Sequence, residues 1–128
     1  YEYRSDDPDC LRQMRQQFLE MVEAARCPEA SFELTLLGER PCGNAVPEEA
    51  HRRLLDRCAQ AIVDVTHVEP GYRASSTDAN IPLSLGIPAT TFGLYLGARS
   101  HTREEYIETE SLRTGLKIGL LILAASFR

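Results

Sequence analysis

Residues 75–106 read SSTDANIPLSLGIPATTFGLYLGARSHTREEY, and they set the order of elements in the second half of the chain. The stretch opens with hydroxyl, carboxylate and amide side chains, which satisfy free backbone N–H groups in turns and at helix starts. A helix over residues 79–85 is predicted next, then a turn at residues 86–88 and a short apolar strand over residues 89–94. This strand leads into a loop that contains His101. We therefore expect a turn, a helix, a strand and a histidine loop in succession.

A strand, a helix and a second strand are predicted within the first 38 residues. Apolar or aromatic residues alternate with polar ones over residues 1–4 and again over residues 32–36. Between them Asp7 caps a helix whose first position is Pro8, where the missing N–H costs nothing. The apolar face of this helix consists of Leu11, Met14, Phe18, Met21, Val22 and Ala25. Such a unit is half of a ferredoxin-like layer, and alone it leaves sheet edges open.

Two more helices are predicted, one on each side of the opening stretch. A linker rich in Gly, Pro and Asn over residues 38–47 precedes the first, and Glu48 and Glu49 lie in its first turn, where the helix dipole favours carboxylates. Its apolar face consists of Ala50, Leu54, Leu55, Cys58, Ala61, Ile62 and Val65. We expect this helix to pack on a sheet. The second helix, within residues 112–127, is apolar on most sides and so requires cover on more than one face.

Length and charge limit the classes of partner. The 128 residues suit one ordinary domain with its own core. The formal net charge of -5 disfavours nucleic acid, because nucleic-acid binders concentrate Lys and Arg in a basic patch. No membrane partner is expected, since the most apolar run, residues 118–127, falls short of the roughly 20 residues that span a bilayer. The charged first ten residues lack the apolar core of a signal peptide, which favours a cytoplasmic location.

The four cysteines contain no Cys-x-x-Cys pair. A zinc knuckle or a redox motif needs that close spacing. Two disulfides are formally compatible with the count, but a chain with 43% hydrophobic residues does not need them. We expect reduced thiols with a structural role.

Three short motifs carry a resemblance to a known family. They are Ser76-Thr77-Asp78-Ala79-Asn80, Gly86-Ile87-Pro88, and His101-Thr102 with Glu104-Glu105. Together they resemble the carboxy-terminal third of the zinc-dependent exopeptidase and amidohydrolase family that contains carboxypeptidase G, aminoacylases, acetylornithine deacetylase, succinyl-diaminopimelate desuccinylase, peptidase T and dipeptidases. Glu2-Tyr3-Arg4 with the helix after it is similar to the second half of that family's inserted lid domain. The resemblance covers nearly the whole chain.

The resemblance implies an α/β fold in two parts. Residues 1–40 correspond to half of a ferredoxin-like α+β lid, which implies a homodimer formed through the lid. Residues 41–128 correspond to the carboxy-terminal part of the α/β catalytic domain. In that family two zinc ions, or other divalent metals such as cobalt, activate a water that cleaves a peptide or an N-acyl amino acid amide bond.

The resemblance assigns one metal ligand and no catalytic residue to this chain. His101 matches a zinc ligand of the family. The other ligands lie in the family's amino-terminal half, and neither His51 nor His67 stands in a ligand motif here. Because a catalytic zinc takes three protein ligands, we expect this chain alone to be an inactive part of the enzyme.

The resemblance also implies substrate-binding residues, which are Arg4, Ser76, Thr77, Asp78 and Asn80. Arg4 matches a lid arginine that holds the substrate carboxylate, a task that suits a bidentate guanidinium. Structural alternatives are an exposed surface arginine for Arg4, and a turn with a helix cap for residues 75–78. Two other functions also stay open, a non-catalytic interaction or dimerisation module on the same scaffold and an unrelated α/β domain in which His101 is structural.

Overall fold

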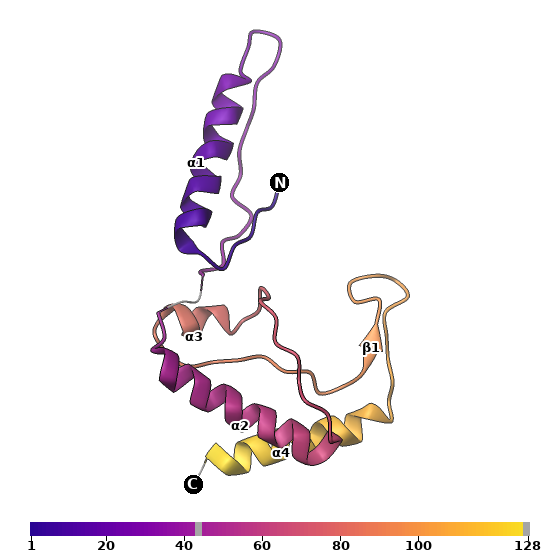
Figure 1. Ribbon diagram of the computed structural model, residues 1–128. Helices are drawn as coiled ribbons and strands as arrows, with labels where there is room; N and C mark the ends of the chain where they lie inside the picture. The colour runs from indigo at the N-terminus through magenta and orange to yellow at the C-terminus, as the bar shows by residue number, and fades with distance from the viewer. Residues whose placement is uncertain (43–44, 127–128) are drawn as a thin grey trace. The chain divides into compact units, whose positions relative to one another are not determined.

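The computed structural model describes residues 1–42 and 45–126, which form a mostly helical protein with a minor β component (Figure 1). The elements are α1 (Pro8–Ala24), α2 (Glu48–Thr66), α3 (Asn80–Ser84), β1 (Gly97–Ala98), β2 (Tyr106–Ile107) and α4 (Ser111–Ser126). In the described ranges the sheet is one antiparallel pair, in which Gly97 lies opposite Ile107 and Ala98 opposite Tyr106.

The chain divides into two compact units. Unit 1 consists of Tyr1–Val46 and Ser76–Ile87, and unit 2 consists of Pro47–Ser75 and Pro88–Arg128. The predicted boundary between residues 1–40 and 41–128 stays a prediction. Two residues of the predicted linker, Gly43 and Asn44, lie outside the described residues, as do Phe127 and Arg128 at the end of the last predicted helix.

The core of unit 2 lies between α2 and α4, which pack against each other (Figure 1). Four side chains form it: Cys58, Ala61, Ile118 and Ile122. The apolar face predicted for the second long helix is therefore confirmed, since Leu54, Ile62 and Val65 flank this core. Its predicted partner is wrong. The apolar face of α2 packs against the apolar face of α4, and within the described residues no sheet covers the apolar face of α2.

A glycine lets the backbone approach α4 closely. Gly115 is buried, and a Cβ at this position would collide with the backbone carbonyl of Leu94. The segment before β1 can therefore run directly over the helix, which brings Phe92 against the core. Residues 89–94 form no strand, because their close neighbour is a helix, which offers no free strand edge for pairing.

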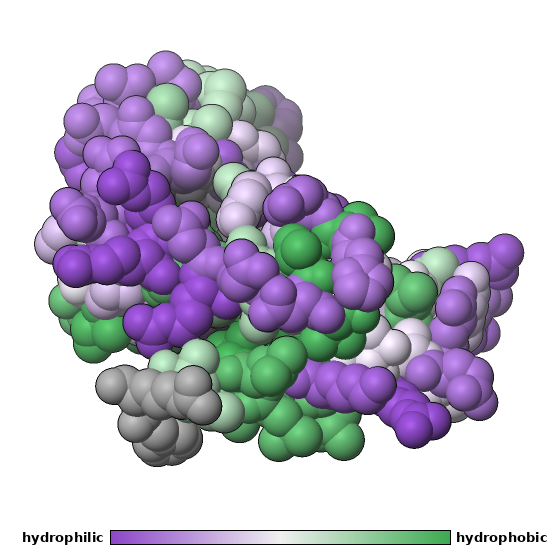
Figure 2. Space-filling view, turned by 60° about the horizontal axis from the view of Figure 1, so that its bottom comes forward, coloured by the Kyte–Doolittle hydropathy of each residue, from purple (hydrophilic) through white to green (hydrophobic). Residues whose placement is uncertain are grey.

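The bounds of α4 agree with the last predicted helix, but its cover does not. Gly115, Ile118 and Ile122 on one face are buried. The other faces remain exposed in the described structure, with Leu116, Leu120 and Leu123 among the exposed apolar side chains. Apolar side chains accordingly gather at the surface in Figure 2. The expectation that α4 is covered on more than one face is wrong within residues 1–42 and 45–126.

Unit 1 contains α1, whose start is as predicted. Asp7 is the N-cap residue, and its Oδ1 accepts from the N–H groups of Asp9 (2.7 Å) and Cys10 (3.3 Å). Pro8 occupies the first position. No residue of α1 is buried, and Phe18 is half-buried beneath the ring of Tyr1, with 4.6 Å between the ring centroids.

The strands predicted at residues 1–4 and 32–36 are wrong. Both segments run without regular structure, although the segment after α1 lies alongside that helix (Figure 1). A strand needs a hydrogen-bonded neighbour, and no backbone hydrogen bond joins these two segments in the described ranges. In this part of unit 1 the one bridge is between Cys27 and Ala30, at the turn that follows the helix.

No helix in the described part of the chain combines the length and the apolarity that a membrane crossing requires.

Candidate functional site

His101 lies in a loop that a short hairpin anchors to the start of α4. Beyond the two paired residues of each strand, Leu96 O accepts from Glu108 N at 2.8 Å. Leu96 N donates to the hydroxyl of Ser111, the first residue of α4, also at 2.8 Å. The base of the loop is thus tied to the helix by hydrogen bonds on both strands.

The loop backbone turns sharply on both sides of the histidine. Arg99 has φ 60 and His101 has φ 67, both in the left-handed region, which residues other than glycine seldom adopt. Several hydrogen bonds close this turn. Thr102 donates to Arg99 O from its N at 3.1 Å and from its Oγ1 at 2.7 Å, and His101 N donates to Glu105 Oε2 at 3.1 Å. The backbone of His101 is therefore held from within the loop.

The His101 side chain is exposed. Within the described residues its imidazole makes no hydrogen bond or ion pair, so both ring nitrogens are open to a ligand. The other histidines are placed differently. His51 Nε2 lies 3.0 Å from Ala89 O, and His67, with φ 59, is the left-handed residue that ends α2.

A zinc site needs more donors than this loop brings together. Residues 1–42 and 45–126 contain no group of three or more His, Cys, Asp or Glu side chains that could hold a metal ion. One carboxylate of the loop, that of Glu105, accepts a hydrogen bond from the backbone N–H of His101. The described residues thus fit the role of one ligand and do not by themselves make up a zinc centre.

The polar residues 76–80 form a turn before α3. Thr77 Oγ1 accepts from Ala79 N at 3.3 Å, and Asn80 Oδ1 accepts from Thr77 N at 3.0 Å. The predicted turn is confirmed. The predicted helix cap is confirmed in part: Ala79, directly before α3, has no capping side chain, but Thr77 Oγ1 within residues 75–78 accepts from the Ala79 N–H.

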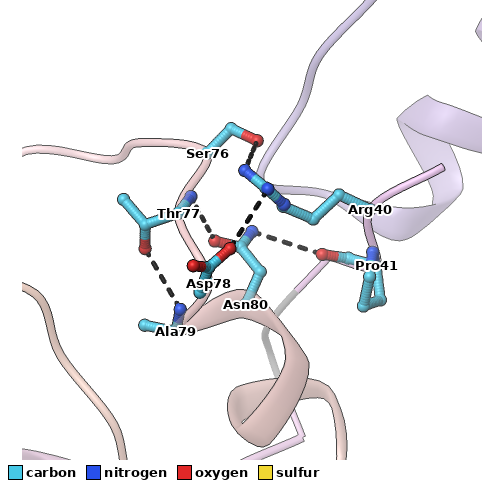
Figure 3. A network of polar contacts seen from close by, with 7 residues as sticks. All are labelled: Arg40, Pro41, Ser76, Thr77, Asp78, Ala79 and Asn80. Atoms are coloured by element: carbon cyan, nitrogen blue, oxygen red, sulfur yellow. Dashed lines mark hydrogen bonds and ion pairs between the residues drawn. The ribbon is translucent and has the colours of Figure 1, made fainter. Parts of the chain in front are cut away.

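Three side chains of this turn reach the same dipeptide, Arg40-Pro41 (Figure 3). Arg40 Nη1 donates to Ser76 Oγ and Nη2 donates to Asp78 Oδ1, each at 3.2 Å. Asn80 Nδ2 donates to Pro41 O at 3.2 Å. Sequence reasoning missed Arg40, whose only local signal was a charged residue inside a linker rich in Gly and Pro.

Arg4 does not join this network. Its Nε donates to Glu2 Oε1 at 2.8 Å, and both side chains are exposed. In the structure Arg4 is therefore a surface arginine paired with a near neighbour. Arg4 and the four turn residues belong to unit 1, whereas His101 belongs to unit 2.

All four cysteines are free thiols. Burial raises the pKa of the Cys58 thiol in the α2 core. Burial and the nearby Asp6 and Asp7 carboxylates raise the pKa of Cys42, whose thiol donates to Asp6 O at 2.7 Å. A raised pKa lowers the thiolate fraction, so neither thiol has the properties of an activated nucleophile.

Scans of protein-family models, of curated proteins and of solved structures find no match to this chain. The candidate residues are therefore judged by their chemistry and geometry. They comprise the exposed imidazole of His101 in a hydrogen-bonded loop, and the polar turn at residues 76–80, which hydrogen bonds connect to Arg40 and Pro41.

Proposed function

We propose that this chain is the carboxy-terminal part of a dizinc hydrolase that cleaves a peptide bond or an N-acyl amino acid amide bond. His101 is one zinc ligand, and the turn at residues 76–80, with Arg4, binds substrate. Residues 1–40, which contain α1, are half of a lid through which two copies pair. The protein acts in the cytoplasm, on small peptide or N-acyl amino acid substrates.

One observation carries the proposal. His101 has an exposed imidazole free of intrachain bonds, on a loop whose backbone is fixed by Glu105 and by the hairpin base. A metal ligand gains from such a fixed backbone, because less freedom is lost when the metal binds. The sequence around it, His101-Thr102, is the segment that resembles the family's ligand motif.

The part that this chain plays is limited to binding. It supplies one ligand, and we assign no step of the hydrolysis to its residues. In such enzymes the zinc ions activate the attacking water, and the remaining ligands would come from polypeptide beyond these 128 residues.

Zinc analysis of the intact protein that contains this chain tests the ligand assignment. His101→Asn removes the imidazole and keeps a residue type that tolerates the left-handed backbone. We expect dialysed His101→Asn protein to contain less zinc than the wild type, measured by plasma mass spectrometry, and to lose hydrolysis of N-acyl amino acids.

His67→Asn is the matched control. His67 is also exposed and also left-handed, so its replacement removes an equivalent imidazole at an equivalent backbone cost. Wild-type zinc content is expected for this variant. Equal zinc content in His101→Asn and wild type would overturn the ligand assignment.

A non-catalytic interaction module is the second candidate. It is favoured by Phe32, Leu34 and Leu36, three apolar side chains at alternate positions that are all exposed in the described structure. An extended segment of this kind can pair with another chain. Leu34→Lys should then abolish self-association in light scattering without changing zinc content, and an unchanged molar mass would exclude this pairing.

A further inference from the structure

The turn at residues 76–80 needs support from outside itself. The helix after it has five residues, and isolated helices shorter than about 12 residues are marginal in water. The internal bonds of the turn include those from Thr77 N to Asn80 Oδ1 and from Ala79 N to Thr77 Oγ1, and a backbone bond from Asn80 N to Thr77 O at 3.1 Å. These bonds join residues within the turn, so they do not connect the turn to the rest of the chain.

That support comes from a segment far away in the sequence. Arg40 is 36 residues before Ser76 and 38 before Asp78, and its two terminal nitrogens each bond a different one of them. Asn80 reaches the adjacent carbonyl of Pro41. Alternate positions of the turn are therefore held by two consecutive residues on the facing segment (Figure 3).

The chemistry of the guanidinium suits this task. Its planar fork fixes the direction of both donors at once, whereas a lysine ammonium is a single point charge that cannot set two directions. Asp78 is 96% exposed and Arg40 is 43% exposed in their side chains, so the ion pair by itself contributes little. Its effect lies in joining Ser76 and Asp78, which orients the backbone between them.

We propose that Arg40 is a positioning residue, which fixes the conformation of the turn at residues 76–80 and so presents its side chains to the substrate. The part about substrate rests on the proposed function. The part about conformation does not, and it is measured separately.

Hydrogen exchange with mass spectrometry on the encoded protein tests the conformational part. In Arg40→Gln, peptides that cover residues 76–81 should exchange about threefold to tenfold faster, which corresponds to the loss of about one ordinary hydrogen bond. Arg40→Lys should fall between Arg40→Gln and the wild type. Unchanged exchange in Arg40→Gln would overturn the proposal.

Arg15→Gln is the matched control. Arg15 is an exposed arginine of the same unit, which pairs with Glu39 at 3.6 Å, next to Arg40 in the sequence. It makes no hydrogen bond or ion pair with the turn in the described structure. Faster exchange at residues 76–81 in Arg15→Gln as well would show a general loosening of unit 1 and would count against a specific role for Arg40.

A second variant tests whether Arg40 and Asp78 hold the turn through their shared contact or act independently. Asp78→Asn removes the charge that Arg40 contacts. If both residues act through one contact, the double variant Arg40→Gln/Asp78→Asn should exchange no faster than Arg40→Gln alone. Multiplied effects of the two substitutions would contradict a shared contact.

Steady-state kinetics test the substrate part. Arg40→Gln should raise KM severalfold with little change in kcat, because a displaced turn weakens binding without touching the metal. Equal loss of kcat would contradict a role in presentation to the substrate. If the wild type hydrolyses neither peptides nor N-acyl amino acids, the proposed function fails, and the exchange experiment still decides whether Arg40 positions the turn.

Discussion

α1 and α2 each have an apolar face, but only the apolar face of α2 packs against another helix in the described structure. The apolar face of α2 contributes Cys58 and Ala61 to a core, where each is less than one-tenth exposed. The apolar face of α1 contributes no buried residue, and Met21 on it is 60% exposed. Periodicity thus predicts which side of a helix is apolar. Whether that side becomes a core depends on a second element with a matching apolar face, and within the described residues only α2 has one.

The largest expected effect breaks the core of unit 2. Ile118→Ala should lower the free energy of unfolding by about 2–4 kcal/mol, because Ile118 is 5% exposed and its loss leaves a cavity between α2 and α4. Met21→Ala in α1 should change it by less than about 0.5 kcal/mol. Urea denaturation of both variants measures the contrast. Similar losses would mean that α1 is as well packed as α2.

The next effect concerns the close approach of backbone to α4. Gly115→Ala should cost about 1–3 kcal/mol, because the new Cβ collides with the carbonyl of Leu94 and the segment must move. Gly119→Ala is the control, since its Cβ would meet only the side chain of Leu94 at 3.7 Å. Alanine favours the helix, so Gly119→Ala should be neutral or stabilising by up to about 1 kcal/mol. The opposite ranking in urea denaturation would contradict this packing.

The smallest effect concerns the start of α1. Asp7→Ala should cost about 1 kcal/mol, because the N–H groups of Asp9 and Cys10 lose their acceptor. Asp6→Ala removes the same charge from the neighbouring position and should cost less than about 0.5 kcal/mol. Thermal unfolding followed by circular dichroism separates the two variants. If both lost equally, the charge and not the cap would stabilise the helix.

The features that local chemistry decides could be predicted from the sequence. Asp7-Pro8 marks the start of α1, and the spacing of Cys58 and Ala61 marks the inner side of α2. The turn before α3 follows from its hydroxyl and amide side chains, and Gly86, with φ 78, occupies the predicted turn after it.

What could not be predicted is the choice of partner. Apolar and polar residues alternate over residues 1–4 and 32–36 as they do in strands, but this pattern does not show whether a neighbouring strand is present. In the same way, the apolar face of α2 did not show that it packs against a helix and not against the predicted sheet. β1 and β2 have two residues each, too few for alternation to be visible. The bonds of Arg40 cross 36 and 38 residues and leave no local pattern.

For the candidate site, residue types indicated chemistry and could not indicate surroundings. The sequence placed His101 in a loop, and the structure adds that the hydroxyl of Ser111 and the carboxylate of Glu105 hold that loop. The sequence suggested Arg4 as a substrate-binding arginine and gave no specific signal for Arg40, which is the arginine that contacts the turn.

The two units are interleaved along the chain, since each is built from two separate segments. The ribosome synthesises the chain from the N-terminus, so α2 is made before residues 76–87. Unit 1 therefore cannot finish folding until α2, which belongs to unit 2, has been synthesised. Unit 2 is completed only when α4 follows. No single contiguous deletion can therefore remove one unit and leave the other whole. A protease cut between residues 47 and 75 would break the chain within unit 2 and would also separate the two segments of unit 1.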